Sequence, residues 1–172
     1  LNTFFEPVIA APALVVADRS FSSVSPQLSV AYRVRPERMI YASVGRGFKA
    51  GGFNPASPAG SESFGEEHAW QVEGGAKTSW AAGRVTANVS VFRINWNDMQ
   101  LNLPNPQVPA QFYVANVARA TSTGAELELN ARPREGLDLF GVLGYTRARF
   151  GSGSVSSGLD VSGKTLPNSP DY

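Results

Sequence analysis

The chain has 172 residues, including 17 Gly and 12 Pro, a composition that suits many short strands and turns. A net charge of +1, with no basic run of about five or six residues, excludes the electrostatic footprint of a nucleic-acid partner. The absence of Cys excludes disulfides and Cys-based zinc sites, and the single His68 offers no His cluster for a transition metal, so we expect no cofactor and no metal site.

The first half of the chain predicts two strands and a long loop. Alternating apolar and polar residues predict a half-buried strand over about 22–34. A tight turn is expected at 35–37, because Pro36 fixes its φ angle and lacks the N–H that a strand would need. A second strand is expected over about 39–48. The Gly- and Pro-rich stretch 49–65 then predicts a long loop.

A hairpin of two longer strands follows. Residues 66–80 alternate between small or apolar side chains and a polar face that carries both signs of charge. The segment 81–83 is short enough for a hairpin turn, and a long strand is expected over about 84–101. Its alternation changes at Phe92, where apolar residues move to the formerly polar face. A bulge near Phe92, or a strand packed on both sides, would explain the change.

The last part of the chain repeats this arrangement. A Pro-rich loop at 102–111 precedes a strand over about 112–132, and a tight turn is expected at 133–136. A strand over 137–150 and a Gly- and Ser-rich loop at 151–165 complete the series.

Long loops and short turns alternate along the chain, so the long loops share one end of the predicted sheet. This asymmetry is typical of transmembrane β-barrels, whose strands need only about 9–11 residues. No apolar run approaches the ~20 residues of a spanning helix. The predicted fold class is all-β: an antiparallel meander of about six to eight strands that forms part of a transmembrane β-barrel. A soluble β-sandwich that binds a partner is the alternative of a different class.

Two nucleotide-binding motifs match by spacing but not by context. Gly158 to Thr165 fits the phosphate-binding P-loop pattern, yet Pro167 and Pro170 follow where a helix would have to begin. The stretch 45–50 fits a loose dinucleotide fingerprint, but Gly51 and its neighbours cannot open a helix. We therefore expect no nucleotide site.

The sequence offers no arrangement for catalysis. A nucleophile elbow is absent, and His68 is expected to be a polar residue at a strand end rather than a base. Three carboxylates lie on the polar faces of predicted strands, where a charged barrel lumen explains them: Glu73, Glu126 and Glu128. We expect no enzymatic activity.

Several segments in this order resemble the barrel region of TonB-dependent outer-membrane receptors, over about 21–172. VSPQLSVAYRV and MIYASVGRGFKAGGFNP resemble paired strands and the outward loop after them. Three further segments of this chain resemble strands of that family: QVEGGAK, VSVFRINWNDMQL and NVARATSTGAELELNARP. GKTLPNSPDY resembles the segment that leads from a loop into a strand, which also accounts for the P-loop match.

The resemblance implies a 22-stranded barrel in the bacterial outer membrane, plugged by a separate N-terminal domain. It implies import of a scarce nutrient such as a ferric siderophore, powered by the TonB complex. The expected partners are outer-membrane lipid, the remaining barrel strands, the plug domain, TonB and an iron chelate. Residues 1–172 are expected to be a partial barrel without plug domain or signal peptide, with 1–20 unassigned. The alternative is a complete eight-stranded outer-membrane barrel, with one more strand within 3–17 and another at the end.

Ligand contacts are expected in the outward loop after the second strand, because selectivity resides in such loops. Arg46 and Lys49 would attract an anionic ferric complex, and Phe53 would stack on a catecholate-like ring. Asn54 completes the candidate set. The alternative for all four residues is a solvated loop.

Overall fold

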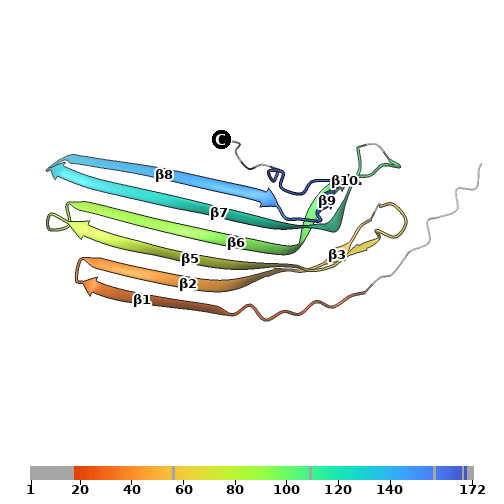
Figure 1. Ribbon diagram of the computed structural model, residues 1–172, viewed down its shortest axis with the longest axis horizontal. Coiled ribbons are helices and arrows are strands. Elements are labelled where there is room, and N and C mark those ends of the chain that lie inside the picture. The colour runs from red at the N-terminus through yellow and green to blue at the C-terminus, as the bar shows by residue number, and fades with distance from the viewer. Residues whose placement is uncertain (1–17, 56, 109, 157, 168, 170–172) are drawn as a thin grey trace, which may run out of the picture.

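A six-stranded antiparallel sheet makes up most of the described chain (Figure 1). The structure, a computed structural model, describes residues 18–55, 57–108, 110–156, 158–167 and 169. Each strand of the sheet pairs with the next along the chain, so the topology is a meander. The strands are β1 (Gln27–Arg35), β2 (Arg38–Lys49), β5 (Glu67–Trp80), β6 (Val85–Pro104), β7 (Phe112–Arg134) and β8 (Leu137–Phe150). This architecture confirms the predicted all-β meander.

Two small hairpins lie at one end of the sheet. One lies between β2 and β5 and consists of β3 (Gly52–Phe53) and β4 (Ser63–Phe64). The other follows β8 and consists of β9 (Val155–Ser156) and β10 (Leu159–Asp160). Figure 1 shows both hairpins at the same end, opposite the tight turns that join β1 to β2, β5 to β6 and β7 to β8. The predicted separation of long loops from short turns is therefore confirmed.

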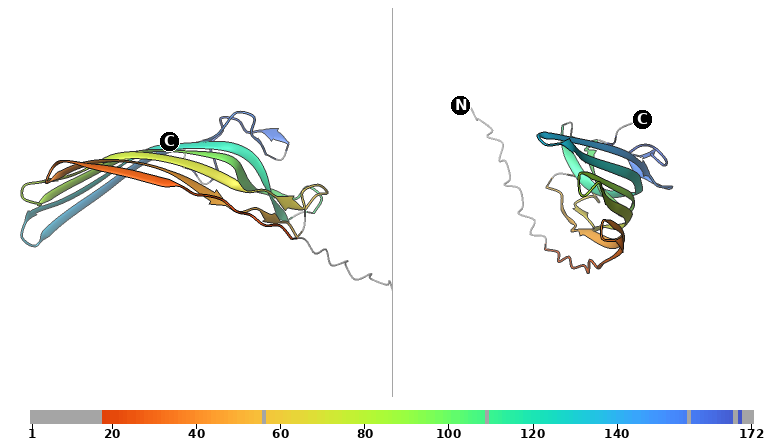
Figure 2. Two further views of the ribbon diagram at one scale, coloured as in Figure 1. Left: turned by 90° about the horizontal axis from the view of Figure 1, so that it is seen from below. Right: turned by 90° about the vertical axis from the view of Figure 1, so that its left-hand side faces the viewer.

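The sheet has one apolar and one polar face, because successive strand residues point to opposite sides. The apolar face is widely exposed: the side chains of Leu143, Leu28 and Val91 are 68%, 64% and 57% accessible. Seen end-on, the strands follow an arc (Figure 2), and the hollows along the sheet are lined mainly by residues of the polar face. The polar face is thus concave, and the apolar face is convex and bare, as in the wall of a membrane barrel.

The few buried residues of the described chain lie where the loops meet the ends of the last three strands. They are Leu103, Ala118, Ala120, Ala148 and Phe150 among the apolar ones. The sheet elsewhere has no second layer against it in the described part of the chain, so no β-sandwich forms. The described residues also contain no helix of the length and apolarity needed to cross a membrane.

Of the two explanations for the change of pattern at Phe92, the one that places a bulge near this residue is wrong. β6 pairs with β7 without interruption from Val85 to Trp96, and the register shifts only between Trp96 and Gln100. The unbroken alternation of β6 leaves Phe92 on the polar face, opposite its register partner Gly124, where an added Cβ atom would collide with the Phe92 ring. The missing side chain of the glycine makes room for the aromatic ring, so no change of register is needed.

Within the described chain the edge of β1 is open, and the edge of β8 is open except at its loop end, where residues 148–150 are hydrogen-bonded to segment 163–166. β1 pairs only with β2, and β8 pairs only with β7 among the six strands. The additional strand that an eight-stranded barrel would require within 3–17 lies outside the described residues. The described strands by themselves do not close a barrel.

Candidate functional site

The polar face carries a cluster of ionisable side chains near the middle of the sheet. The Tyr41 hydroxyl donates a hydrogen bond to Glu73 Oε1 at 2.7 Å, and the Lys77 ammonium lies 5.7 Å from the centre of the Tyr41 ring. On the neighbouring strands, Asn88 Nδ2 donates to Glu128 Oε2 at 2.9 Å. These residues line a shallow hollow together with Ser90 and Glu126. Such a surface is suited to water or to a polar partner inside a barrel, not to hydrocarbon.

Aromatic rings on this face cover glycines of the adjacent strand. Tyr41 is the register partner of Gly75, and Phe92 is the register partner of Gly124. A Cβ atom on Gly75 would come within 2.6 Å of the Tyr41 ring. Each ring therefore shields a stretch of backbone that has no side chain of its own, and fixes the register between two strands.

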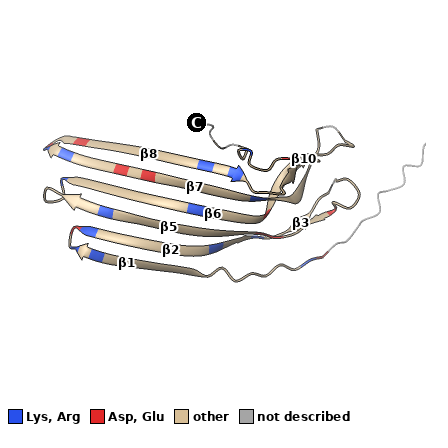
Figure 3. Cartoon of the chain, in the orientation of Figure 1, with Lys and Arg blue, Asp and Glu red and all other residues tan. Residues whose placement is uncertain are grey.

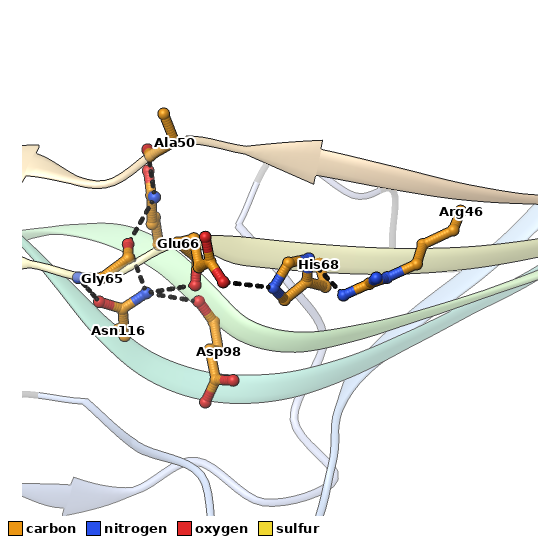
Figure 4. A network of polar contacts seen from close by, with 8 residues as sticks. Arg46, Ala50, Gly65, Glu66, His68, Asp98 and Asn116 are labelled. Carbon is orange, nitrogen blue, oxygen red and sulfur yellow. Dashed lines mark hydrogen bonds and ion pairs between the residues drawn. The ribbon is translucent and has the colours of Figure 1, made fainter. Parts of the chain in front are cut away.

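Three amide side chains tie the long loop after β2 to the wall. Gln100 Nε2 donates to the carbonyl oxygens of Ala50 and Gly65, both at 2.9 Å. Asn116 accepts a hydrogen bond from Gly65 N at 2.6 Å and donates to the Asp98 carbonyl at 2.7 Å. Figure 4 shows Asn116 bridging these segments. The third is Asn54, which bonds the backbone of β7. The loop is therefore held in place at both of its ends.

Next to Asn116, a series of three polar side chains, Arg46, His68 and Glu66, connects β2 to the start of β5 (Figure 4). His68 Nε2 lies 3.0 Å from Glu66 Oε1, and His68 Nδ1 lies 3.0 Å from an Arg46 guanidinium nitrogen. Because Arg46 can only donate, Nδ1 must accept, so the arrangement fits a neutral imidazole that donates from Nε2 to Glu66. The His68 ring also packs against Phe48, with 5.6 Å between ring centres. The expectation of a polar strand-end role for His68 agrees with this position.

The structure does not bring the four predicted ligand residues together in one loop. Arg46 and Lys49 belong to β2, because the ladder with β5 continues as far as Lys49 and Glu67 despite the glycines. Their placement in a loop was therefore wrong. Arg46 shares the convex face with Val44, whereas Lys49 lies on the opposite face and is exposed. The guanidinium of Arg46 is also engaged with His68.

The other two predicted residues do lie in the loop but differ in their surroundings. Phe53 of β3 is 43% exposed. Asn54 uses its side chain on Ser61 O and on the backbone of Val114. The structural roles of Asn54, Gln100 and Asn116 were missed because nothing in the local sequence distinguishes them from other loop or strand residues. Their partners are 7 to 60 residues away.

The segment that matched the P-loop pattern supplies β10, the second strand of the small hairpin, and the turn after it. Gly158 and Gly163 have φ angles of +77° and +73°, and Lys164 N donates to Val161 O. The Ser162 hydroxyl and amide donate to Asp160, which lowers the pKa of that carboxyl. One short strand, β10, and the turn after it therefore occupy this segment, and no helix begins among its residues. Among the described residues no group of three or more His, Asp or Glu side chains is placed to hold a metal ion.

Comparison with solved structures relates this sheet to iron-uptake receptors. The ferric yersiniabactin uptake receptor FyuA from Yersinia pestis is 28% identical, with a TM-score of 0.62 over 74% of this chain and 19% of that chain. The ferripyoverdine receptor of the outer membrane of Pseudomonas aeruginosa is 17% identical, with a TM-score of 0.57, 77% of this chain and 18% of that chain. The FrpB iron transporter from Neisseria meningitidis is 18% identical, with a TM-score of 0.57 over 78% of this chain and 21% of that chain.

The chain spans about a fifth of the length of each of these proteins. The last two similarities concern the fold alone. The family described as TonB dependent receptor-like, beta-barrel matches residues 3–172, and this match extends closer to the N-terminus than the motifs recognised in the sequence. The chain therefore belongs to the TonB-dependent receptor β-barrel family, and its strands lie in the bacterial outer membrane.

Proposed function

We propose that this chain forms part of the wall and three outward loops of an outer-membrane active transporter that imports a ferric siderophore. The observation that carries the proposal is the two-faced, curved sheet: its bare apolar face suits lipid, and its concave face presents Tyr41, Glu73 and Lys77 to a polar interior. The family match and the 28% identity to a ferric yersiniabactin uptake receptor support iron-chelate import.

Transport requires parts beyond the described sheet. The open edges of β1 and β8 would leave backbone N–H and C=O groups unpaired in hydrocarbon, so further barrel strands must pair with them. In the proposed receptor a plug domain fills the polar interior, and TonB supplies energy through the N-terminal part. The role of this chain is structural and selective, with no catalytic step.

The ligand contacts proposed in this chain are Lys49 and Phe53, since both are exposed and lie where β2 runs into the outward loop. Lys49 would attract an anionic chelate, and Phe53 would stack on an aromatic iron ligand. Arg46 and Asn54 act indirectly: their hydrogen bonds with His68 and Val114 hold the end of the strand and the loop in position.

Uptake in an iron-starved strain that carries the full-length receptor as its only siderophore receptor tests the proposal. We expect uptake of at least one labelled ferric siderophore from a chemically diverse panel, and loss of uptake when TonB is deleted. Lys49→Gln with Phe53→Ala should weaken binding by about tenfold without reducing the amount of receptor. Binding of only a non-iron nutrient, or uptake that persists without TonB, would overturn the proposal.

A further inference from the structure

The apolar surface of three adjacent strands ends at one common level. The last apolar residues on the convex faces of β6, β7 and β8 are register partners of one another: Val91, Ala125 and Tyr145. The next positions toward the loops on the same face are again partners: Arg93, Thr123 and Arg147. We name these three residues the basic row. It runs directly across the strands at the edge of the apolar surface.

Two tryptophans place this edge relative to the membrane. Trp70 and Trp80 lie on the convex face of β5, 42% and 47% exposed, and mark the two ends of its apolar stretch. Ten residues along a strand tilted by roughly 40° correspond to about 26 Å of height, close to the ~25 Å apolar band between the aromatic girdles of outer-membrane barrels. Trp70 pairs with Asn95, one position beyond Arg93 on the same face. The basic row therefore lies at the outward border of the hydrocarbon.

Positive charge at this border is not neutralised by the protein. Arg93 and Arg147 are exposed, and neither has an ion-pair partner among the described residues. Arg93 Nε donates only to Asn95 Oδ1 at 3.1 Å. Figure 3 shows the positive segments of β6 and β8 toward the loop end, while the acidic segments of β7 lie nearer the turns. Those acidic residues, Glu126 and Glu128, also belong to the opposite face.

We propose that the basic row binds the phosphate of a lipid headgroup in the outer leaflet. The backbones of Arg93 and Arg147 are two strand spacings apart, about 10 Å, so both flexible side chains can reach a phosphate placed above Thr123. Guanidinium groups bind phosphate oxygens in a bidentate manner, and the Thr123 hydroxyl adds a donor. Arg149, one position farther out, donates to Gly163 O and adds charge to the same face.

The surface below the basic row favours a lipid over a free anion. Val91, Tyr145 and Leu143 lie on the same face as the two arginines, next to them on the side of the tight turns. They are 57%, 52% and 68% exposed. An acyl chain attached to the bound phosphate would cover these side chains, whereas inorganic phosphate would leave them bare. Tyr145 has the amphipathic character of residues that occur at headgroup level. This inference rests on the placement of the chain in the outer membrane and not on the nutrient that is imported.

Lipid binding by the purified full-length receptor in neutral detergent tests the inference. The probes are bisphosphorylated lipid A, the same lipid after removal of its phosphates, and inorganic phosphate, with retained lipid counted by native mass spectrometry. We expect the phosphorylated lipid to bind at least about tenfold more tightly than the dephosphorylated lipid, as charge-assisted hydrogen bonds would require. Arg93→Gln with Arg147→Gln should abolish this preference.

The matched control is Arg33→Gln with Arg134→Gln, which removes the same charge at the turn end of the sheet and should leave the preference intact. An unchanged preference in the Arg93 and Arg147 variant would overturn the inference. Displacement of the lipid by inorganic phosphate at equal phosphate concentration would also overturn it, since the site would then recognise free anions. Siderophore binding by the same preparations reports folding and tests the transport proposal separately.

Discussion

Asn54 exchanges two hydrogen bonds with the backbone of Val114, which lies 60 residues later in the chain. Asn54 Nδ2 donates to Val114 O at 2.8 Å, and Val114 N donates to Asn54 Oδ1 at 2.9 Å. The side chain thus imitates one rung of a β-ladder and joins the loop after β2 to β7. A loop rich in Gly and Pro is thus joined to β7 by the Asn54 side chain, in addition to the hydrogen bonds between Asn116 of β7 and Gly65.

Replacing Asn54 by Ala should loosen this loop without unfolding the barrel. The substitution leaves the part-buried Val114 N–H and C=O groups without protein partners, at a cost of about 1–3 kcal/mol each. Amide hydrogen exchange of the full-length receptor should accelerate over 50–66 and at Val114, with no change in the turn-side halves of the strands. Gln107→Ala, at an exposed loop residue, serves as the control. Unchanged exchange in the Asn54 variant would show that the other loop contacts suffice.

Gly124→Ala should strongly destabilise the wall. The added Cβ would meet the Phe92 ring and approach Tyr145 O to 2.5 Å, so two strands would have to separate. Overpacking of this kind costs about 1–3 kcal/mol or more. Gly144→Ala in β8 is the matched control because nothing lies within 4 Å of its added Cβ. The temperature at which the folded receptor loses its fast migration on gels should fall for the Gly124 variant only, and equal shifts would refute the explanation.

Substitutions in the turn between β5 and β6 should increase the stability of the protein. Ala81 and Ala82 have φ angles of 53° and 55°, and Gly83 N bonds back to Trp80 O, so two alanines occupy left-handed positions at the centre of the turn. The left-handed conformation costs an alanine about 1 kcal/mol, whereas Asn and Gly adopt it more readily. Ala81→Asn with Ala82→Gly should raise the unfolding free energy by roughly 1 kcal/mol. Ala87→Gly within β6 should instead lower it, and a loss in both variants would contradict the turn assignment.

His68 should tolerate an amide better than an apolar ring. Its two ring nitrogens connect Arg46 to Glu66, each at 3.0 Å. His68→Phe would remove both hydrogen bonds and leave the half-buried guanidinium unpaired, at a cost of about 1–3 kcal/mol. His68→Gln retains a donor and an acceptor and should lose less. Thermal unfolding of the two full-length variants tests this: a larger loss of stability in His68→Gln than in His68→Phe would mean that ring packing on Phe48 matters more than the two hydrogen bonds.

Local rules account for most of the elements that the sequence predicted. Alternation with period two and the turn residues at 35–37, 81–83 and 133–136 located the six long strands to within a few residues, apart from the start of β1. They also separated the lipid face from the lumen face. These features depend only on neighbours within a few positions, so they are legible in one sequence.

The change of pattern at Phe92 could not be explained from neighbouring residues in the sequence. A ring on a polar face looks like a register error until its partner across the strands is known to be Gly124. The partner belongs to β7, and no spacing rule connects the two positions. Arg46 likewise looked like a loop cation, although the ladder with β5 keeps it in the strand and His68 holds its guanidinium.

The sequence by itself determined the membrane-barrel class, the order of the strands and the two faces of the wall, because a strand carries its own periodicity. Only the tertiary structure decided which polar residues act together. Asn54, Gln100 and Asn116 fasten the loop through partners brought near by the meander, and Arg93 meets Arg147 in one row because β6, β7 and β8 pair in a particular register. Register aligns residues that are distant in sequence, and no single strand contains that information.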